Sequence, residues 1–233
     1  ITLIGGAWCG LVLGAADTLQ QVGISMTTAG KAGFITALYI ILVPLMGHFM
    51  GHKVPRIIVI CVTLAIAGFY LLCINGDFQV SFGDFLVLCC AVFFALHILV
   101  IDHFLLKKAN SIKLSWVQFA TAFLFSGTLT VLFEQPDWSA LWAAKWPLLY
   151  AGGLSSGVAY TLQIVGQKYT EPTTATLIMS LESVFAALAG WLILGEVMTA
   201  KELTGCVLVF AAVILAQIPL PHISFRQKNH NHQ

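Results

Sequence analysis

The sequence predicts an all-α integral membrane protein: eight transmembrane helices of a ten-helix, five-plus-five bundle built from an inverted repeat. Three observations lead to this prediction, namely a very low content of charged residues, long apolar runs and an internal repeat. Hydrophobic residues make up 59% of the chain and charged residues 9%, whereas about a quarter of a soluble domain is charged. So few charges cannot cover a surface that faces water, and we therefore expect a lipid bilayer as the surroundings.

The apolar runs are long enough to span a membrane, because a bilayer core needs about 20 apolar residues per helix. Short polar or turn-forming stretches separate the runs, among them Asn75-Gly76-Asp77, Gln135-Pro136-Asp137 and Glu171-Pro172. The predicted helices cover residues 4–24, 30–50, 54–74, 82–104, 114–133, 146–166, 173–194 and 201–218.

The first of these helices carries Gly6, Gly10 and Gly14, spaced four residues apart on one face. Small residues at this spacing allow two helices to approach closely. The simpler interpretation is static packing. The functional alternative is a smooth face along which helices slide during transport.

The internal repeat relates the segment Gly10–Gly23 to the segment Gly153–Gly166, each position lying 143 residues later. Both segments read G-L-x-x-G-x-A-x-T-L-Q-x-V-G. A repeat of this kind inside apolar stretches predicts a duplicated membrane bundle, which is typical of secondary transporters.

The repeat pairs the first three helices with the last three and leaves the helices at 82–104 and 114–133 without partners. A complete first copy would need two further helices before Ile1, about 64 residues, to match residues 82–145. Matching helices lie five spans apart, an odd number, so they cross the membrane in opposite directions. We divide the chain into residues 1–75, the last three helices of repeat one; residues 82–218, repeat two; and residues 219–233, a polar cytoplasmic tail.

The lysines and arginines predict the orientation, because cytoplasmic loops carry an excess of them. One set of helix ends carries three of these basic residues: Lys31, Lys145 and Lys201. We therefore place the C-terminus in the cytoplasm with the other set of eight: Lys53, Arg56, Lys107, Lys108, Lys113, Lys168, Arg226 and Lys228.

Several short motifs, in their order and spacing from about Gly5 to Ala216, resemble the drug/metabolite transporter superfamily, in particular its EamA-type members. The resemblance implies ten helices in two inverted repeats and the movement of small metabolites, amino acids or drugs, usually outward, across a bacterial inner membrane. The residues that carry it are Thr27 to Thr36 with Pro44, Phe94-Ala95-Leu96-His97, Asp102-His103-Phe104, Leu181-Glu182 with Phe185-Ala186-Ala187, and Leu194-Gly195-Glu196.

Glu182 and His97 are the sharpest candidates for a substrate site. Glu182 lies near the middle of a predicted span, where a charge costs about 2.5–3.5 kcal/mol, so we expect it to face a polar cavity. The alternative for Glu182 is a protonated, hydrogen-bonded packing residue. His97 titrates near neutral pH when unperturbed, which suits proton coupling, although an isolated histidine is often only a packed bundle residue.

Further polar residues complete the candidate site. Gln20 and Gln163 are related by the repeat and should face one another across the pseudo-two-fold axis. Buried polar residues also hold membrane helices together, which is the alternative for each of them. We expect alternating access, coupled to protons through Glu182 or His97, or else uniport. The predicted substrate-binding residues are Glu182, His97, Gln163, Tyr39, Gln118, Gln20 and Tyr160.

Other function classes find less support in the sequence. A net charge of +1 without a basic stripe argues against a nucleic-acid partner. The six cysteines form no CxxC pair, the histidines of the tail are too loosely placed for a metal site, and we expect no cofactor. The alternatives are a non-transporting fragment or scaffold, and an intramembrane lipid-processing enzyme. Such enzymes usually cluster carboxylates or histidines, and the sequence has no DxxD, HExxH or G-x-S-x-G motif.

Overall fold

The regular structure of this computed structural model is helical throughout the part of the chain that it describes. The described residues are 1–27, 29–51, 54–73, 81–182, 184–185, 188, 192 and 199–217. The helices are α1 (Thr2–Ile24), α2 (Ala29–Ala37), α3 (Tyr39–Phe49), α4 (Arg56–Cys73), α5 (Phe82–Leu106), α6 (Ser111–Phe133), α7 (Trp138–Ala143), α8 (Lys145–Leu149), the π-helix η1 (Tyr150–Val158), α9 (Ala159–Gln167), α10 (Pro172–Met179) and α12 (Ala200–Gln217).

Five helical stretches within the described residues are long and apolar enough to cross a membrane, so the chain is a multi-pass membrane protein. A shorter apolar helix covers Arg56–Leu71. Part of the predicted helix at 173–194 lies outside the described residues, and the counts of eight and ten helices stay predictions. The five stretches are Thr2–Ile24, Ala32–Phe49, Phe82–Leu106, Ser111–Phe133 and Lys145–Gln167.

Local hydrogen bonds explain where α5 begins. The hydroxyl of Ser81 accepts a hydrogen bond from the Asp84 amide at 3.1 Å, and the Ser81 amide donates to the Asp84 carboxylate at 2.7 Å. This capping box satisfies amides that a helix leaves unpaired at its start. The Thr27 hydroxyl also donates to Asp84, so the segment after α1 is tied to the start of α5.

Three predicted helices differ from simple α-helices. The span at 30–50 is interrupted at Leu38, between α2 and α3. The helix α10 ends at Ser180, whose hydroxyl donates to the Leu177 carbonyl at 2.6 Å. The span at 146–166 is π-helical over Tyr150–Val158. π-Helical turns are rare and often occur at functional sites.

The glycines of α1 are used for close packing against α6. A Cβ atom at Gly10 would lie 2.4 Å from the Gln118 carbonyl oxygen, and one at Gly6 would lie 2.5 Å from the Val117 Cβ. In the second copy, Gly153 is equivalent to Gly10 and has no heavy atom within 4 Å of such a Cβ, and Gly157 is equivalent to Gly14 and meets only the Gly152 carbonyl oxygen of its own helix. The glycine face is therefore a packing surface in the first copy only.

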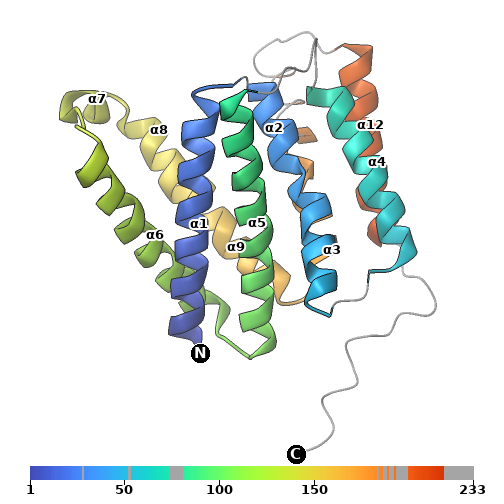
Figure 1. Cartoon of the computed structure of the whole chain (residues 1–233), viewed down its shortest axis with the longest axis horizontal. Helices are drawn as coiled ribbons and strands as arrows, with labels where there is room; N and C mark the ends of the chain where they lie inside the picture. Colours follow the sequence, from blue (N-terminus) through green and yellow to red (C-terminus); the bar gives the residue numbers. More distant parts are fainter. Residues whose placement is uncertain are drawn as a thin grey trace, which may run out of the picture.

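The helices stand side by side in one layered bundle (Figure 1). From the N-terminus α1 runs upward, whereas the span α8–η1–α9 runs downward, so the two copies of the repeated segment are antiparallel (Figure 1). Superposition of the whole copies about an axis in the membrane plane stays a prediction. The largest core cluster joins α3 and α4 with α10 and α12 through buried residues that include Ile40, Phe69, Leu177 and Val209.

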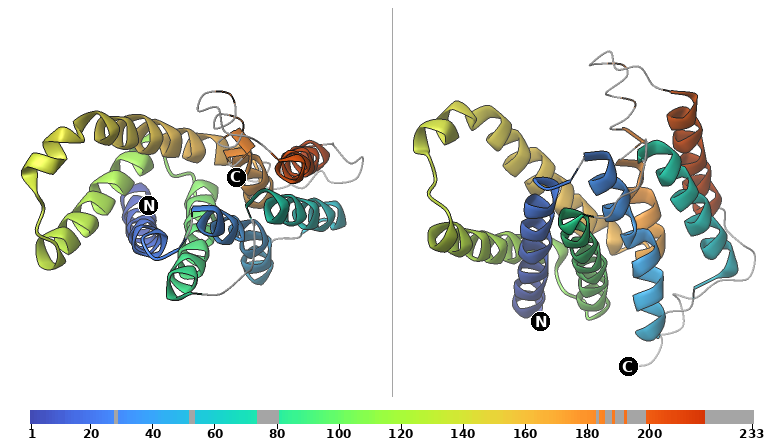
Figure 2. Two further views of the ribbon diagram at one scale, coloured as in Figure 1. Left: turned by 90° about the horizontal axis from the view of Figure 1, so that it is seen from above. Right: turned by 45° about the horizontal axis from the view of Figure 1, so that its top comes forward.

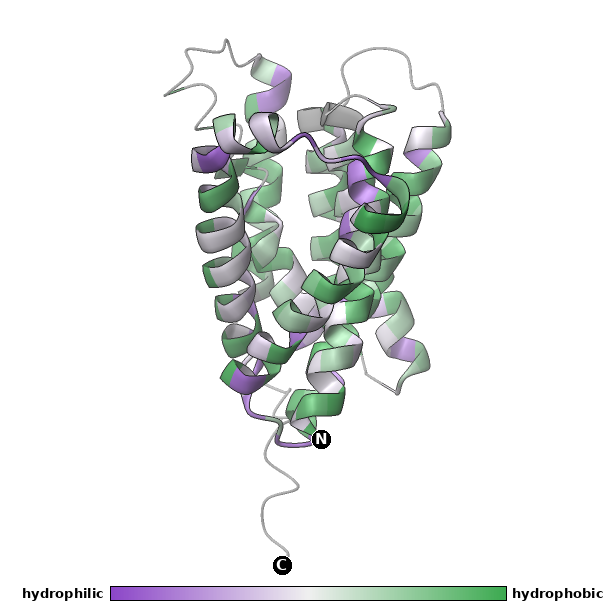
Figure 3. Cartoon of the chain, turned by 90° about the vertical axis from the view of Figure 1, so that its left-hand side faces the viewer, coloured by the Kyte–Doolittle hydropathy of each residue, from purple (hydrophilic) through white to green (hydrophobic). Residues whose placement is uncertain are grey.

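On one side of the bundle, α6 and α8 diverge and α7 bridges their far ends (Figure 2). The described side chains there are largely apolar and exposed, such as Phe123 at 75% and Val131 at 82%. Hydrophobic residues run along most of the helix lengths in Figure 3. Such surfaces are expected where helices face lipid tails.

Candidate functional site

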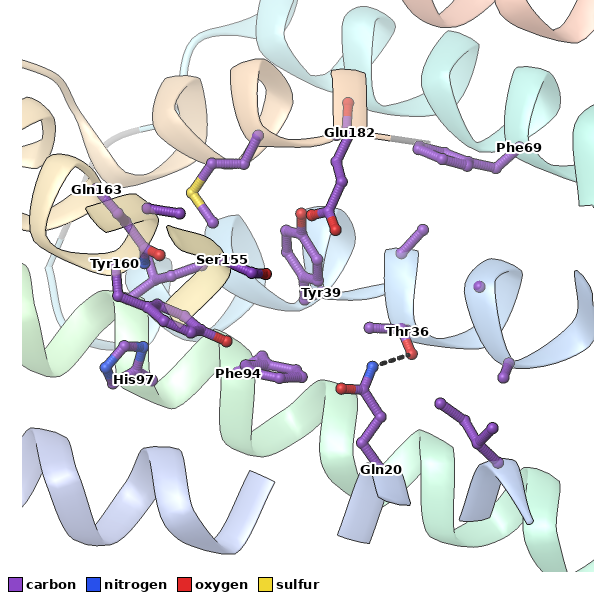
Figure 4. Close-up of a pocket in the computed structure, with 18 residues that line it drawn as sticks. Gln20, Thr36, Tyr39, Phe69, Phe94, His97, Ser155, Tyr160, Gln163 and Glu182 are labelled. Atoms are coloured by element: carbon purple, nitrogen blue, oxygen red, sulfur yellow. Dashed lines mark hydrogen bonds between the residues drawn. The ribbon is translucent and has the colours of Figure 1, made fainter. Parts of the chain in front are cut away.

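A cavity of about 580 Å³ lies between the two copies of the repeat. It is bordered by α1, α2–α3, α4, α5, the η1–α9 span and the end of α10 (Figure 4). Ligand sites typically have volumes of about 300–1,000 Å³. Its described polar lining residues are Gln20, Thr36, Tyr39, His97, Ser155, Tyr160, Gln163, Ser180 and Glu182.

The structure brings six of the seven residues predicted for a substrate site together around this cavity. Gln118 does not line the cavity and instead contacts His97 behind the wall. The residues are contributed by several different spans, which explains why no local motif could group them. The six that line the cavity are Glu182, His97, Gln163, Tyr39, Gln20 and Tyr160.

Four pairs of residues that line the cavity occupy equivalent positions in the two copies of the repeat. From the sequence alone, we expected only the two glutamines to face one another. Because equivalent positions of both copies border the same space, the cavity lies where a pseudo-two-fold axis between the copies would pass. The pairs, each 143 positions apart, are Gln20 with Gln163, Thr36 with Met179, Ala37 with Ser180, and Tyr39 with Glu182.

Tyr39 and Glu182 are the central pair. Each follows a helix interruption, at Leu38 in the first copy and at Ser180 in the second. The exposed Glu182 side chain enters the cavity, and its carboxylate points toward the Tyr39 hydroxyl (Figure 4). Interrupted helices at a midplane site are a recurring feature of transporters with inverted repeats.

The two glutamines are not equivalent in their bonding. The Gln20 side-chain amide donates to the Thr36 hydroxyl at 3.4 Å, which links α1 to α2 (Figure 4). The repeat-related position of Thr36 is Met179, which has no hydroxyl to accept from Gln163. Gln20 and Gln163 therefore have different partners available, although the repeat makes their positions equivalent.

The His97 side chain contacts two neighbouring side chains, those of Gln118 and Tyr160. Its Nε2 lies 2.9 Å from the Gln118 Oε1, and its ring meets the Tyr160 ring edge-on with centroids 6.1 Å apart. An amide oxygen only accepts, so Nε2 is the donor in this arrangement, and in the neutral imidazole Nδ1 is then an acceptor. His97 is 1% exposed, and the Gln118 Nε2 has no hydrogen-bond partner. His97 thus packs the bundle as well as bordering the cavity.

The EamA-like transporter family model matches residues 81–217. The chain belongs to the EamA-like transporter family. It is also similar to an uncharacterized transporter of Archaeoglobus fulgidus, with 34% identity over 202 residues that cover 86% of this chain. The chain spans 64% of that relative's length. The family resemblance noted in the sequence is thereby confirmed.

A solved structure, described only as the crystal structure of a protein, has the same fold as this EamA-like chain. Its TM-score is 0.74 at 18% identity, and the alignment covers 93% of this chain and 84% of the other. At this identity the likeness concerns the fold alone. The matched family and the relative from Archaeoglobus fulgidus are both described as transporters.

The cavity of the EamA-like chain also contains residues that sequence reasoning missed. Ser155, Phe94 and Ser180 line it, although no single-residue signal marks them. The available signal for Ser180 was its place two residues before the predicted site residue Glu182. Within the described residues, no group of three His, Cys, Asp or Glu side chains is placed to hold a metal ion.

Proposed function

We propose that this EamA-like protein moves a small-molecule substrate across the membrane by alternating access, with the cavity between the repeats as the substrate site. The observation that carries the proposal is the set of repeat-related pairs around one cavity. When two inverted copies exchange conformations, a site between them opens first to one side and then to the other. Direction follows the family resemblance: export across a bacterial inner membrane, with the C-terminus in the cytoplasm.

In this proposal the substrate contacts the six lining residues named above, and Gln118 orients His97. A proton carried by Glu182 or His97 is the proposed coupling ion. The Gln20–Thr36 hydrogen bond joins two helices of one copy. The second copy has Met179 at the position equivalent to Thr36, so Gln163 has no hydroxyl there to pair with.

The test needs no knowledge of the substrate. Thr36 and Met179 line the cavity from the two copies, so Thr36→Cys and Met179→Cys report on access to it. Each variant is labelled with a membrane-impermeant maleimide in right-side-out and in inside-out vesicles. The parent chain, which has its own cysteines, gives the background.

We expect both variants to react above background in both kinds of vesicle, because alternation exposes the cavity to each side in turn. Gly127→Cys is the control for labelling outside the cavity. Gly127 lies on α6, and a Cβ there would have no neighbour within 4 Å. Access from one side only would contradict alternating access and favour the scaffold alternative.

A further inference from the structure

We infer that the cavity selects small organic cations, that is, substrates with a protonated amine next to an aromatic or other apolar body. The inference rests on the proposed transport function and names the substrate class of the same site. Three features of the described lining support it: the sign of its charge, the position of that charge and the kind of surface around it.

The charge of the cavity is negative. The described lining residues include one carboxylate, Glu182, and no lysine or arginine. With His97 neutral, Glu182 therefore carries the formal charge of this lining. An anionic substrate would therefore meet charge of its own sign without a cation to pair with.

The position of Glu182 suits an ammonium group. Its side chain is exposed to the cavity, and the carboxylate is directed at Tyr39 on the opposite copy (Figure 4). An ammonium group donates hydrogen bonds to a carboxylate, and such charge-assisted bonds are stronger than neutral ones. Tyr39, across from it, offers its phenol oxygen as a further acceptor.

The surrounding surface suits the body of such a molecule. The rings of Tyr39, Phe94 and Tyr160 all border the cavity. Aromatic faces attract cations as well as packing against apolar groups. The edge-on contact with the His97 ring holds the Tyr160 ring in place before a substrate enters. In the neutral form of His97, Nδ1 is an acceptor and adds no donor that would favour an anion.

The experiment compares three probes that share a phenyl ring and a short chain but differ in charge: 2-phenylethylamine, 2-phenylethanol and 3-phenylpropionate. Their dissociation constants are measured at neutral pH with the 233-residue chain in lipid nanodiscs, and empty nanodiscs correct for partition into lipid. We expect the amine to bind about ten- to a hundredfold more tightly than the alcohol, the size of one charge-assisted hydrogen bond. The carboxylate should bind most weakly.

Variants assign the preference to Glu182. Glu182→Gln keeps the shape and should remove most of the difference between amine and alcohol, whereas Glu182→Asp keeps the charge and should retain the preference. Glu134→Gln is the matched control, because Glu134 is exposed at the end of α6 and outside the cavity lining. It should bind all three probes as the parent chain does.

Equal affinities for the three probes, or tighter binding of the carboxylate, would overturn the inference and leave the cavity as a substrate site. An amine preference that survives in Glu182→Gln, or is lost in Glu182→Asp, would overturn the assignment to this carboxylate. Binding of none of the probes to the parent chain would contradict the inference. If the cysteines placed in the cavity also react from one side only, the proposed transport function fails with it.

Discussion

The repeat provides a matched pair of substitutions that should have opposite effects on stability. Gly10 and Gly153 are equivalent positions, yet Gly10 packs against α6 and a methyl group added at Gly153 would have no neighbour within 4 Å. We expect Gly10→Ala to destabilise the protein and Gly153→Ala to leave it unchanged or slightly more stable.

The magnitude follows from the contact distances. A Cβ at Gly10 would lie 2.4 Å from the Gln118 carbonyl oxygen and 2.6 Å from the Thr121 Cβ, whereas ordinary contacts begin near 3.4 Å. The backbone of α6 must therefore retreat by about 1 Å, and overpacking of this kind costs about 1–3 kcal/mol. Replacing a helical glycine with alanine also contributes about 0.5–1 kcal/mol of stability. That gain is common to both variants and cancels in their difference.

The assay is unfolding of each variant in mixed micelles by increasing mole fractions of sodium dodecyl sulfate, followed by circular dichroism. We expect the free energy of unfolding of Gly10→Ala to lie about 1–3 kcal/mol below that of Gly153→Ala. Equal stability of the two variants, or a more stable Gly10→Ala, would refute the close packing of α1 against α6.

Three further predictions concern single side chains. Ser81→Ala should lower the free energy of unfolding by about 0.5–2 kcal/mol because it removes the cap of α5, and Ser81→Asn should restore most of it; an unchanged midpoint would contradict the cap. Hydrogen bonds from the Ser139 hydroxyl and amide lower the pKa of Asp137, so Ser139→Ala should raise that pKa in a carboxyl-carbon NMR titration. Because the pKa of Asp137 is lowered in the folded state, its capping of α7 is present at neutral pH and is lost as the pH falls through that pKa. Glu182→Gln should abolish the response of 2-phenylethylamine uptake to a pH gradient if Glu182 carries the coupled proton, and an unchanged response in proteoliposomes would exclude this role.

Much of the architecture could be predicted because it depends on patterns along one chain. Apolar runs and polar breaks located the five described membrane spans to within a few residues, since a helix in lipid must satisfy its own backbone hydrogen bonds. The repeat between Gly10–Gly23 and Gly153–Gly166 predicted antiparallel copies by counting spans alone. Neither argument requires knowledge of which side chains touch.

The interruptions within helices were beyond such reasoning. The turns at Leu38 and Ser180 and the π-helical segment Tyr150–Val158 occur in sequences as apolar as the continuous helices. Their alternative backbone hydrogen bonds are tolerated where neighbouring helices or a cavity surround them, which is a property of the assembled bundle.

The sequence by itself determined that this protein is a helical, duplicated membrane protein with ionisable residues at membrane depth. Tertiary structure decided which face each helix turns inward: it placed Tyr39 opposite Glu182 in one cavity, put Gln118 behind His97, and packed the glycines of α1 but not those of the second copy. The physical reason is that a polar or small residue in a membrane helix has the same local pattern whether it binds another helix or lines a cavity. Only the packing of distant segments distinguishes the two.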